Sequence, residues 1–212
     1  MDEIQQIYRR YDKKMKSFGS LDIGGSHHLT CKSMVEIFSN IKDLYNLEDI
    51  RTMDIGSGAG YFVFISHQLG ANSYGIEIQS QHQLLIPHDL YDKDKLYKII
   101  NTDFSMTNIS HYKLYDIIFL IIGLIPYIIS LWELFKDSYR MKAFVFLKPC
   151  KGFKAIWLNM KHHCDIYGWN YFILNVRIAV SQEQRVVILI RKSKKVDFID
   201  LSRSIKRVRF NL

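Results

Sequence analysis

Three glycines and two acidic residues are spaced as in a ligand-binding turn. Asp54 closes a short apolar segment that we predict to be a β-strand, and Gly56, Gly58 and Gly60 follow it at every second position. Because glycines have no Cβ atoms, the backbone N–H groups of such a turn can approach a ligand closely. Glu77 ends the next predicted strand, about 20 residues further on, where a carboxylate can accept hydrogen bonds from both hydroxyls of a ribose. The pattern predicts a site for a ligand that contains a ribose; the alternative is a tight strand-to-helix turn with two incidental surface acids.

The spacing of the glycines separates two classes of cofactor. A dinucleotide site has the pattern Gly-x-Gly-x-x-Gly, whereas here the glycines alternate after an acid. This pattern, with the second acid, resembles the class I S-adenosylmethionine (SAM) dependent methyltransferases. The resemblance implies that Asp54 and the glycine loop, including Ser57, face the amino-acid part of SAM. It also implies that Glu77, followed by Ile78, holds the ribose.

A third acid follows the next predicted strand. Asp103 and Phe104 stand at residues where the resemblance implies that Asp103 accepts a hydrogen bond from the adenine amino group and Phe104 stacks nearby. The alternative is that Asp103 is an ordinary helix N-cap, a position where aspartate is common.

The loop after the fourth predicted strand, which usually faces the reactive methyl group, matches no substrate motif completely. Pro126 and Tyr127 match the second half of the Asn/Asp-Pro-Pro-aromatic motif of nucleic-acid amine methyltransferases, but the amide or carboxylate is absent. The Lys-Asp-Lys-Glu set of ribose 2′-O-methyltransferases also fails, because no aspartate follows this strand. Tyr127 and Lys148 are the candidates for a catalytic role, and Lys148 has no obvious partner in the sequence.

A looser resemblance covers residues 28–77. With its Tyr74-Gly75-Ile76-Glu77 ending, this segment looks like the SAM-binding half of Dot1-type histone lysine methyltransferases. That family's Asn-Asn-aromatic substrate motif is missing from residues 121–124. The acceptor atom is therefore left open.

Hydrophobic periodicity and turn residues predict an α/β fold. We predict helices over 1–16, 27–46, 61–69 and 79–90, and an apolar helix after residue 121. We predict a first strand that residues 53–55 close, and further strands over 73–78, 98–101, 115–121, 143–149, 154–159, 171–180 and 185–191. The polar residues 181–184 predict a hairpin between the last two strands. The resemblance implies a Rossmann-like, doubly wound sheet of about seven strands, mostly parallel with the last strand antiparallel, and helices on both faces.

The 212 residues divide into three predicted parts: an N-terminal helical cover segment (1–46), a SAM-binding core (47–192) and a basic C-terminal tail (193–212). No membrane span is expected, since the apolar stretch between Asp116 and Glu133 contains Gly123 and Pro126 and is shorter than the about 20 residues that a span needs. The three cysteines are odd in number and widely spaced, and the N-terminus has no apolar signal segment. Both observations favour an intracellular protein, cytoplasmic or nuclear.

Basic residues are concentrated near the two ends of the chain. The formal net charge is +8, and residues 191–212 hold eight basic and two acidic residues. Concentrated positive charge predicts a polyanionic partner, namely RNA, DNA or a nucleosome; the alternative is a solvated, solubilising tail. The residues expected to contact this partner are Arg9, Arg10, Lys13, Lys14, Lys194, Lys195, Lys206, Arg207 and Arg209.

Two clusters of histidine and cysteine raise the question of zinc. They are His27, His28 and Cys31 in one cluster and His162, His163 and Cys164 in the other. Their spacing matches no established zinc motif, so we predict no metal site.

Together these patterns predict a SAM-dependent methyltransferase that acts on a macromolecule, either a nucleic acid or a basic chromatin protein. The first alternative is a noncatalytic subunit or scaffold that keeps the fold. The second is a small-molecule methyltransferase whose basic tail only solubilises the protein.

Overall fold

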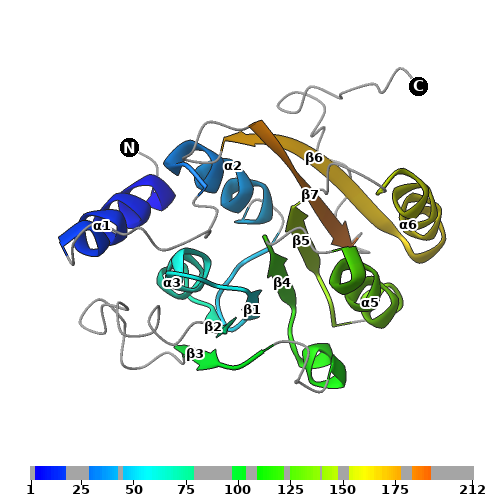
Figure 1. Ribbon diagram of the computed structural model, residues 1–212, viewed down its shortest axis with the longest axis horizontal. Helices are drawn as coiled ribbons and strands as arrows, with labels where there is room; N and C mark the ends of the chain where they lie inside the picture. Colours follow the sequence, from blue (N-terminus) through cyan, green and yellow to red (C-terminus); the bar gives the residue numbers. More distant parts are fainter. Residues whose placement is uncertain are drawn as a thin grey trace.

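Short apolar segments form a seven-stranded sheet in the computed structural model (Figure 1). The structure describes residues 3–17, 29–42, 45–78, 97–103, 109–121, 125–138, 140–147, 153–177 and 183–191. The strands are β1 (Arg51–Ile55), β2 (Asn72–Glu77), β3 (Tyr97–Asn101), β4 (Ile117–Leu120), β5 (Ala143–Leu147), β6 (Trp169–Arg177) and β7 (Glu183–Arg191). Their order across the sheet is β3-β2-β1-β4-β5-β7-β6.

The direction of the strands follows the predicted pattern. From β3 to β5 neighbouring strands pair in parallel, whereas β7 pairs antiparallel with both β5 and β6. The chain passes from β1 to β2 on one side and later enters β4 on the other side of β1. In open α/β sheets, ligands bind outside the carboxyl ends of the strands at such a reversal of order. The Rossmann-like sheet with an inserted antiparallel last strand, and the final hairpin, are therefore confirmed.

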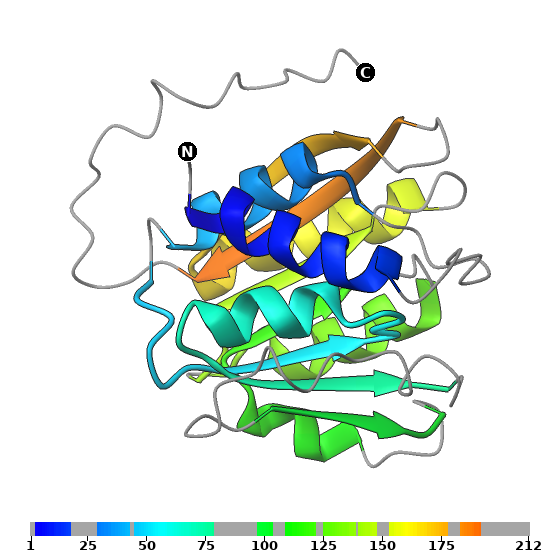
Figure 2. The same cartoon turned by 90° about the vertical axis from the view of Figure 1, so that its left-hand side faces the viewer.

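Helices cover both faces of the sheet (Figures 1 and 2). One face carries α1 (Glu3–Ser17), α2 (Cys31–Lys42) and α3 (Tyr61–Gln68), and the other carries α5 (Ile125–Phe135), α6 (Phe153–Tyr167) and the short 3₁₀ helix η3 (Ile109–Leu114). The predicted helix over 79–90 lies outside the described residues, as does the tail 193–212. Among the helices that the structure describes, none is long and apolar enough to cross a bilayer.

The central strand β4 shows how the two cores are separated. Successive side chains of a strand point to opposite faces of the sheet. Ile117 and Phe119 accordingly belong to the hydrophobic cluster under α1, α2 and α3, and Ile118 and Leu120 belong to the cluster under α5 and α6. All four side chains are buried, as expected for a strand covered on both faces.

The prediction of a strand over 154–159 is wrong, because these residues lie in α6. The buried residues of this segment are Phe153, Trp157, Met160 and Cys164, which recur every three or four positions. This spacing places them on one stripe of a helix, while Leu158 stays 54% exposed on the opposite side. The apolar composition of the segment was compatible with a strand, but its period was that of a helix.

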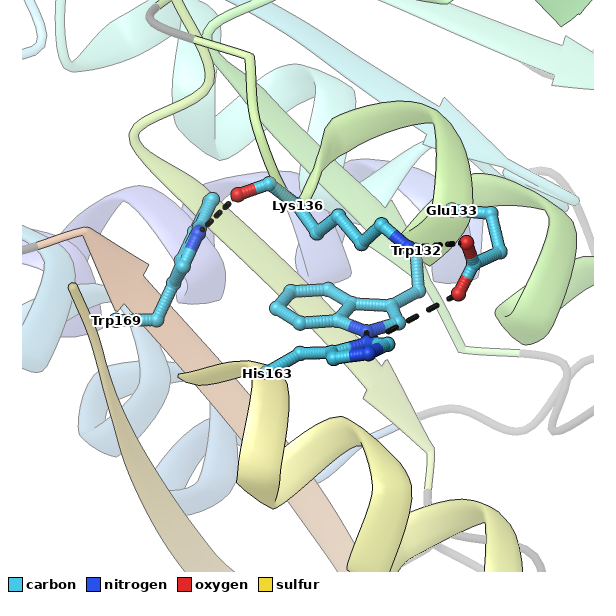
Figure 3. Close-up of polar contacts among 5 residues, drawn as sticks. All are labelled: Trp132, Glu133, Lys136, His163 and Trp169. Atoms are coloured by element: carbon cyan, nitrogen blue, oxygen red, sulfur yellow. Dashed lines mark hydrogen bonds and ion pairs between the residues drawn. The ribbon is translucent and has the colours of Figure 1, made fainter. Parts of the chain in front are cut away.

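Two indole groups connect α5 with α6 and β6 (Figure 3). Trp132 Nε1 donates to His163 Nδ1 over 3.4 Å, and Trp169 Nε1 donates to the Lys136 carbonyl oxygen over 2.8 Å. The ammonium group of Lys136 forms an ion pair with Glu133 one turn earlier. These contacts give the polar atoms of two buried tryptophans partners and fix the helices on this face.

We expect Phe119→Ala to lower the free energy of unfolding by about 3–5 kcal/mol, because it leaves a cavity in a packed core. The Phe119 ring lies 4.7 Å from that of Phe62 in α3 and 5.5 Å from that of Phe38 in α2, so three elements meet at this side chain. Chemical denaturation measures the change. Ile166→Ala, at a side chain that is 60% exposed, is the control; equal losses for both variants would contradict this packing.

Candidate cofactor site

The glycine-rich loop lies where β1 ends and α3 begins. Gly56, Gly58 and Gly60 have φ angles of 73°, 51° and 76°. These angles belong to the left-handed region, which glycine adopts without the steric cost that other residues incur. Gly60 is the residue immediately before α3. The alternating glycines therefore allow the chain to turn sharply from the strand into the helix.

Hydrogen bonds fix this loop against β2. The N–H groups of Gly56 and Ser57 donate to the Ile76 carbonyl oxygen over 2.8 and 2.9 Å. The N–H group of Gly58 donates to Glu77 Oε2 over 2.7 Å in a buried setting. The acid that ends β2 is thus hydrogen-bonded to the middle of the loop that follows β1.

Gly75 permits this close approach. A Cβ atom at this position would lie 2.8 Å from Ser57 Oγ and 2.9 Å from Val63 Cγ2, both shorter than real Cβ contacts. In the sequence, Gly75 is part of the resemblance to Dot1-type enzymes, and its structural role was not predicted. A single glycine inside a predicted strand is a signal for a close backbone approach, and it could have indicated this contact.

Two acidic side chains are buried together at the ends of neighbouring strands. Asp54 is 3% exposed and Glu77 is 7% exposed, and Asp54 is in register with Gly75 of β2. Burial raises the pKa of Asp54 well above its usual value, and the negative charge of Glu77 raises it further. Such a pair favours a ligand that brings positive charge and hydrogen-bond donors.

One buried hydroxyl of the loop is also without a partner. Ser57 is 8% exposed, and its Oγ atom makes no hydrogen bond with the part of the chain that the structure describes. An unsatisfied buried hydroxyl is uncommon in folded proteins. Together with the paired acids and the turn of glycines, it fits a polar ligand bound at this loop.

The ends of β2 and β3 lie side by side at the same edge of the sheet. The Thr102 N–H group donates to the Glu77 carbonyl oxygen over 3.1 Å, which places the adjacent Asp103 close to the end of β2. Asp103 is half-buried and Ile78 is 62% exposed. Phe104 lies outside the described residues, so its predicted role is still a prediction.

Of the two residues predicted to act on the methyl acceptor, the structure describes only Tyr127. Tyr127 lies in the first turn of α5, half-buried and packed against the cluster under α5 and α6. Lys148 lies outside the described residues, as do residues 122–124 of the loop after β4.

The described cysteines of the two histidine and cysteine clusters lie on opposite faces of the sheet. Cys31 begins α2 and Cys164 lies in α6, and these helices cover opposite faces of the sheet (Figure 1). His163 accepts the hydrogen bond from Trp132, while His27 and His28 lie outside the described residues. Among the described residues, no three histidine, cysteine or acidic side chains are grouped as metal ligands.

The fold is that of the class I SAM-dependent methyltransferases. No model of a known protein family and no curated protein matches this sequence. Among solved structures, a candidate RNA methyltransferase from Pyrococcus horikoshii aligns with a TM-score of 0.63 at 13% identity, over 91% of this chain and 100% of that chain.

Two further solved structures share this fold. Magnesium protoporphyrin IX methyltransferase from Synechocystis, with bound S-adenosylhomocysteine (SAH), aligns with a TM-score of 0.54 at 14% identity, over 90% of this chain and 100% of that chain. A precorrin-6y methyltransferase from Geobacter metallireducens aligns with a TM-score of 0.54 at 12% identity, over 80% of this chain and 92% of that chain. The predicted resemblance to class I enzymes is confirmed at the level of the fold, and none of these structures supports the narrower resemblance to Dot1-type enzymes.

We expect Gly75→Ala to destabilise the protein by about 1–3 kcal/mol, because the added methyl group overpacks the contact between β2 and the loop. The φ angle of Gly75 is not in the left-handed region, so the cost is steric rather than conformational. Ser57→Gly removes two of the three closest atoms and should rescue Gly75→Ala in part. A double-mutant cycle of unfolding free energies measures the coupling, and additive effects would contradict the contact.

We expect Asp54→Asn to make the ligand-free protein more stable than the wild type at neutral pH. The folded-state pKa of Asp54 is raised, so the stabilising contribution of the protonated carboxyl is complete below about pH 4. It falls as the pH rises and is lost once the pH passes the folded-state pKa. Between pH 4 and 8, the free energy of unfolding should therefore fall less steeply with rising pH for Asp54→Asn than for the wild type.

The exposed residue Glu48 supplies the control, since Glu48→Gln removes a carboxylate at the start of β1, away from the loop. Its pH profile should follow that of the wild type. If the free energy of unfolding of Asp54→Asn depends on pH as that of the wild type does, the raised pKa of Asp54 is contradicted.

Proposed function

We propose that this protein is a SAM-dependent methyltransferase. The observation that carries the proposal is the buried hydrogen bond from Gly58 to Glu77, which joins the glycine loop after β1 to the acid that ends β2. In a sheet of this strand order, these two strand ends lie at the position where open α/β folds bind nucleotide-like ligands. A dinucleotide is a poorer candidate, because the glycine spacing differs from that of the dinucleotide fingerprint.

The described residues fit the parts of SAM as follows. Glu77 would accept the ribose hydroxyls, and its link to Gly58 fixes the direction of the carboxylate. Asp54 and Ser57 would face the amino-acid part, where a positively charged amine offsets the cost of two neighbouring buried acids. Asp103 would accept from the adenine amino group, with Phe104 beside it.

When bound, SAM supplies a sulfonium methyl group that a nucleophile can displace in line. Such a reaction depends mainly on how the two reactants are aligned. The protein contributes a fixed loop, a buried pair of acids and a sheet edge that hold the donor in one orientation. A protonated amine acceptor would also need a group that takes its proton, and Tyr127 and Lys148 are the candidates for this role.

We further propose that the acceptor is macromolecular and polyanionic, or bound to a polyanion, as in RNA, DNA or a nucleosome. The apolar face of α1 is buried against α2 and α3, and its basic residues Arg9, Arg10 and Lys13 are exposed, with Arg10 also donating a hydrogen bond to Gln68 at the end of α3. Such a surface favours phosphate contacts. The solved structures do not select the acceptor, since one concerns RNA and another a porphyrin. An intracellular location, cytoplasmic or nuclear, belongs to this proposal.

Calorimetric titration with SAM tests the cofactor site. We expect wild-type binding in the micromolar range and no measurable binding for Gly58→Arg, whose side chain would occupy the loop. Glu77→Ala should weaken binding by about 10- to 100-fold, since hydrogen bonds to a charged group contribute about 1.5–3 kcal/mol. Glu77→Gln, which keeps an oxygen acceptor for Gly58, should lose less. Glu48→Ala, at an exposed acid, is the control.

Transfer of a labelled methyl group to histones, tRNA, capped mRNA and DNA then tests the reaction. SAM binding without transfer to any acceptor would favour the noncatalytic scaffold. Absence of SAM binding by the folded wild type would contradict the proposal.

Charge reversal on α1 tests the polyanion. The double variant Arg9→Glu, Lys13→Glu should lose most activity on a polyanionic acceptor and show a weaker salt dependence, with unchanged SAM affinity. Its matched control, Lys154→Glu with Lys161→Glu, makes the same change in net charge at exposed residues of α6 on the other face. Deletion of residues 193–212 should act as the α1 variant does. If the α1 charge-reversal variant and the deletion variant both keep full activity on a small acceptor, the small-molecule alternative is favoured.

A further inference from the structure

The N-terminal helix lies directly against the helix that follows the glycine loop (Figure 2). The Tyr11 ring of α1 stacks on the Phe64 ring of α3 with centroids 4.3 Å apart, and it meets the Tyr61 ring edge-on at 5.0 Å. Tyr61 in turn donates a hydrogen bond to Asp12 of α1 over 3.0 Å. Tyr11 is fully buried in this contact.

The hydroxyl of Tyr11 reaches beyond α3 to the loop itself. It donates to the Ala59 carbonyl oxygen over 2.6 Å in a buried setting. At the other side of the same peptide group, the Gly60 N–H donates to the Ser57 carbonyl oxygen over 2.8 Å. The Ala59–Gly60 peptide is therefore held at both its oxygen and its nitrogen, and one of these two bonds comes from outside the β1-loop-α3 unit.

This anchor acts on a peptide group next to two glycines of the loop. Gly58 and Gly60 flank Ala59, and glycine permits backbone rotations that other residues resist. The Ala59–Gly60 peptide group is followed by one of these glycines, so it can rotate more readily than most peptide groups unless hydrogen bonds hold it. The same short loop carries Gly58, whose N–H group donates to Glu77.

We propose that Tyr11 is a positioning residue for the cofactor loop. Its hydroxyl holds the Ala59–Gly60 peptide, and thereby keeps the N–H group of Gly58 directed at Glu77 before the ligand arrives. Binding is weaker when the competent state of a site is only partly populated, so the anchor raises the affinity without touching the ligand. The inference rests on the proposed function for its ligand, but its structural half concerns the ligand-free loop alone.

Tyr11→Phe is the test, because it removes one oxygen atom and keeps the ring that packs on Phe64. Tyr45→Phe is the matched control. Tyr45 also donates from its hydroxyl to a backbone oxygen, that of Arg191, over 2.7 Å. The Arg191 N–H group donates a hydrogen bond to the carbonyl oxygen of Lys142, the residue before β5. This contact lies at the end of the sheet opposite the glycine loop.

We expect both variants to lose similar stability in chemical denaturation, whereas only Tyr11→Phe binds SAM about 5- to 10-fold more weakly. In the ligand-free protein, amide hydrogen exchange at Gly58 and Gly60 should be faster in Tyr11→Phe than in Tyr45→Phe.

The outcomes separate this inference from the proposed function. If the wild type does not bind SAM, the proposed function fails, and the exchange rates still test the anchor. If folded Tyr11→Phe shows the same amide exchange rates at Gly58 and Gly60 as the wild type, the positioning role is overturned. SAM affinity in Tyr11→Phe equal to that of Tyr45→Phe would also overturn it.

Discussion

The hydrogen bond from the Gly58 N–H group to Glu77 is the contact on which the candidate site depends. It joins the loop after β1 to the end of β2 and fixes the carboxylate that would hold a ribose. It forms only because two glycines permit it. Gly58 has a left-handed φ angle of 51°, and Gly75 leaves room for the loop to pack on β2. The site thus depends on missing side chains as much as on the acids themselves.

This arrangement has a cost in stability. Asp54 and Glu77 are almost fully buried at the ends of adjacent strands, and burial, followed by the negative charge of Glu77, raises the pKa of Asp54. The buried Ser57 hydroxyl, which has no hydrogen-bond partner among the described residues, adds to the cost. Natural proteins tolerate such features mainly at functional sites, where a ligand supplies the missing partners. The well-packed cores on both faces of the sheet offset the cost in the ligand-free protein.

The sequence predicted the parts of the fold that local patterns determine. The alternating glycines between two apolar segments predicted the β1-loop-α3-β2 unit and its acids, because all of these residues are close in the chain. Residues 154–159 were assigned to a strand, since a short apolar segment does not reveal its period until its buried partners are known. The contact between Tyr11 and Ala59 joins residues 48 positions apart, so no local pattern indicates it. The acceptor could not be predicted, because the loop after β4 lacks a recognisable motif.

The measurement that tests the central claim most directly is a titration of the ¹⁵N-labelled protein with SAH, followed by the amide signals in NMR spectra. SAH is the product that the proposed reaction would leave in the site. We expect saturable shifts at Gly56, Gly58, Gly60 and Glu77, with little change at the opposite sheet edge near Tyr45. Unchanged loop signals at saturating SAH, or shifts confined to residues away from the ends of β1 and β2, would contradict the assignment of this loop as the cofactor site.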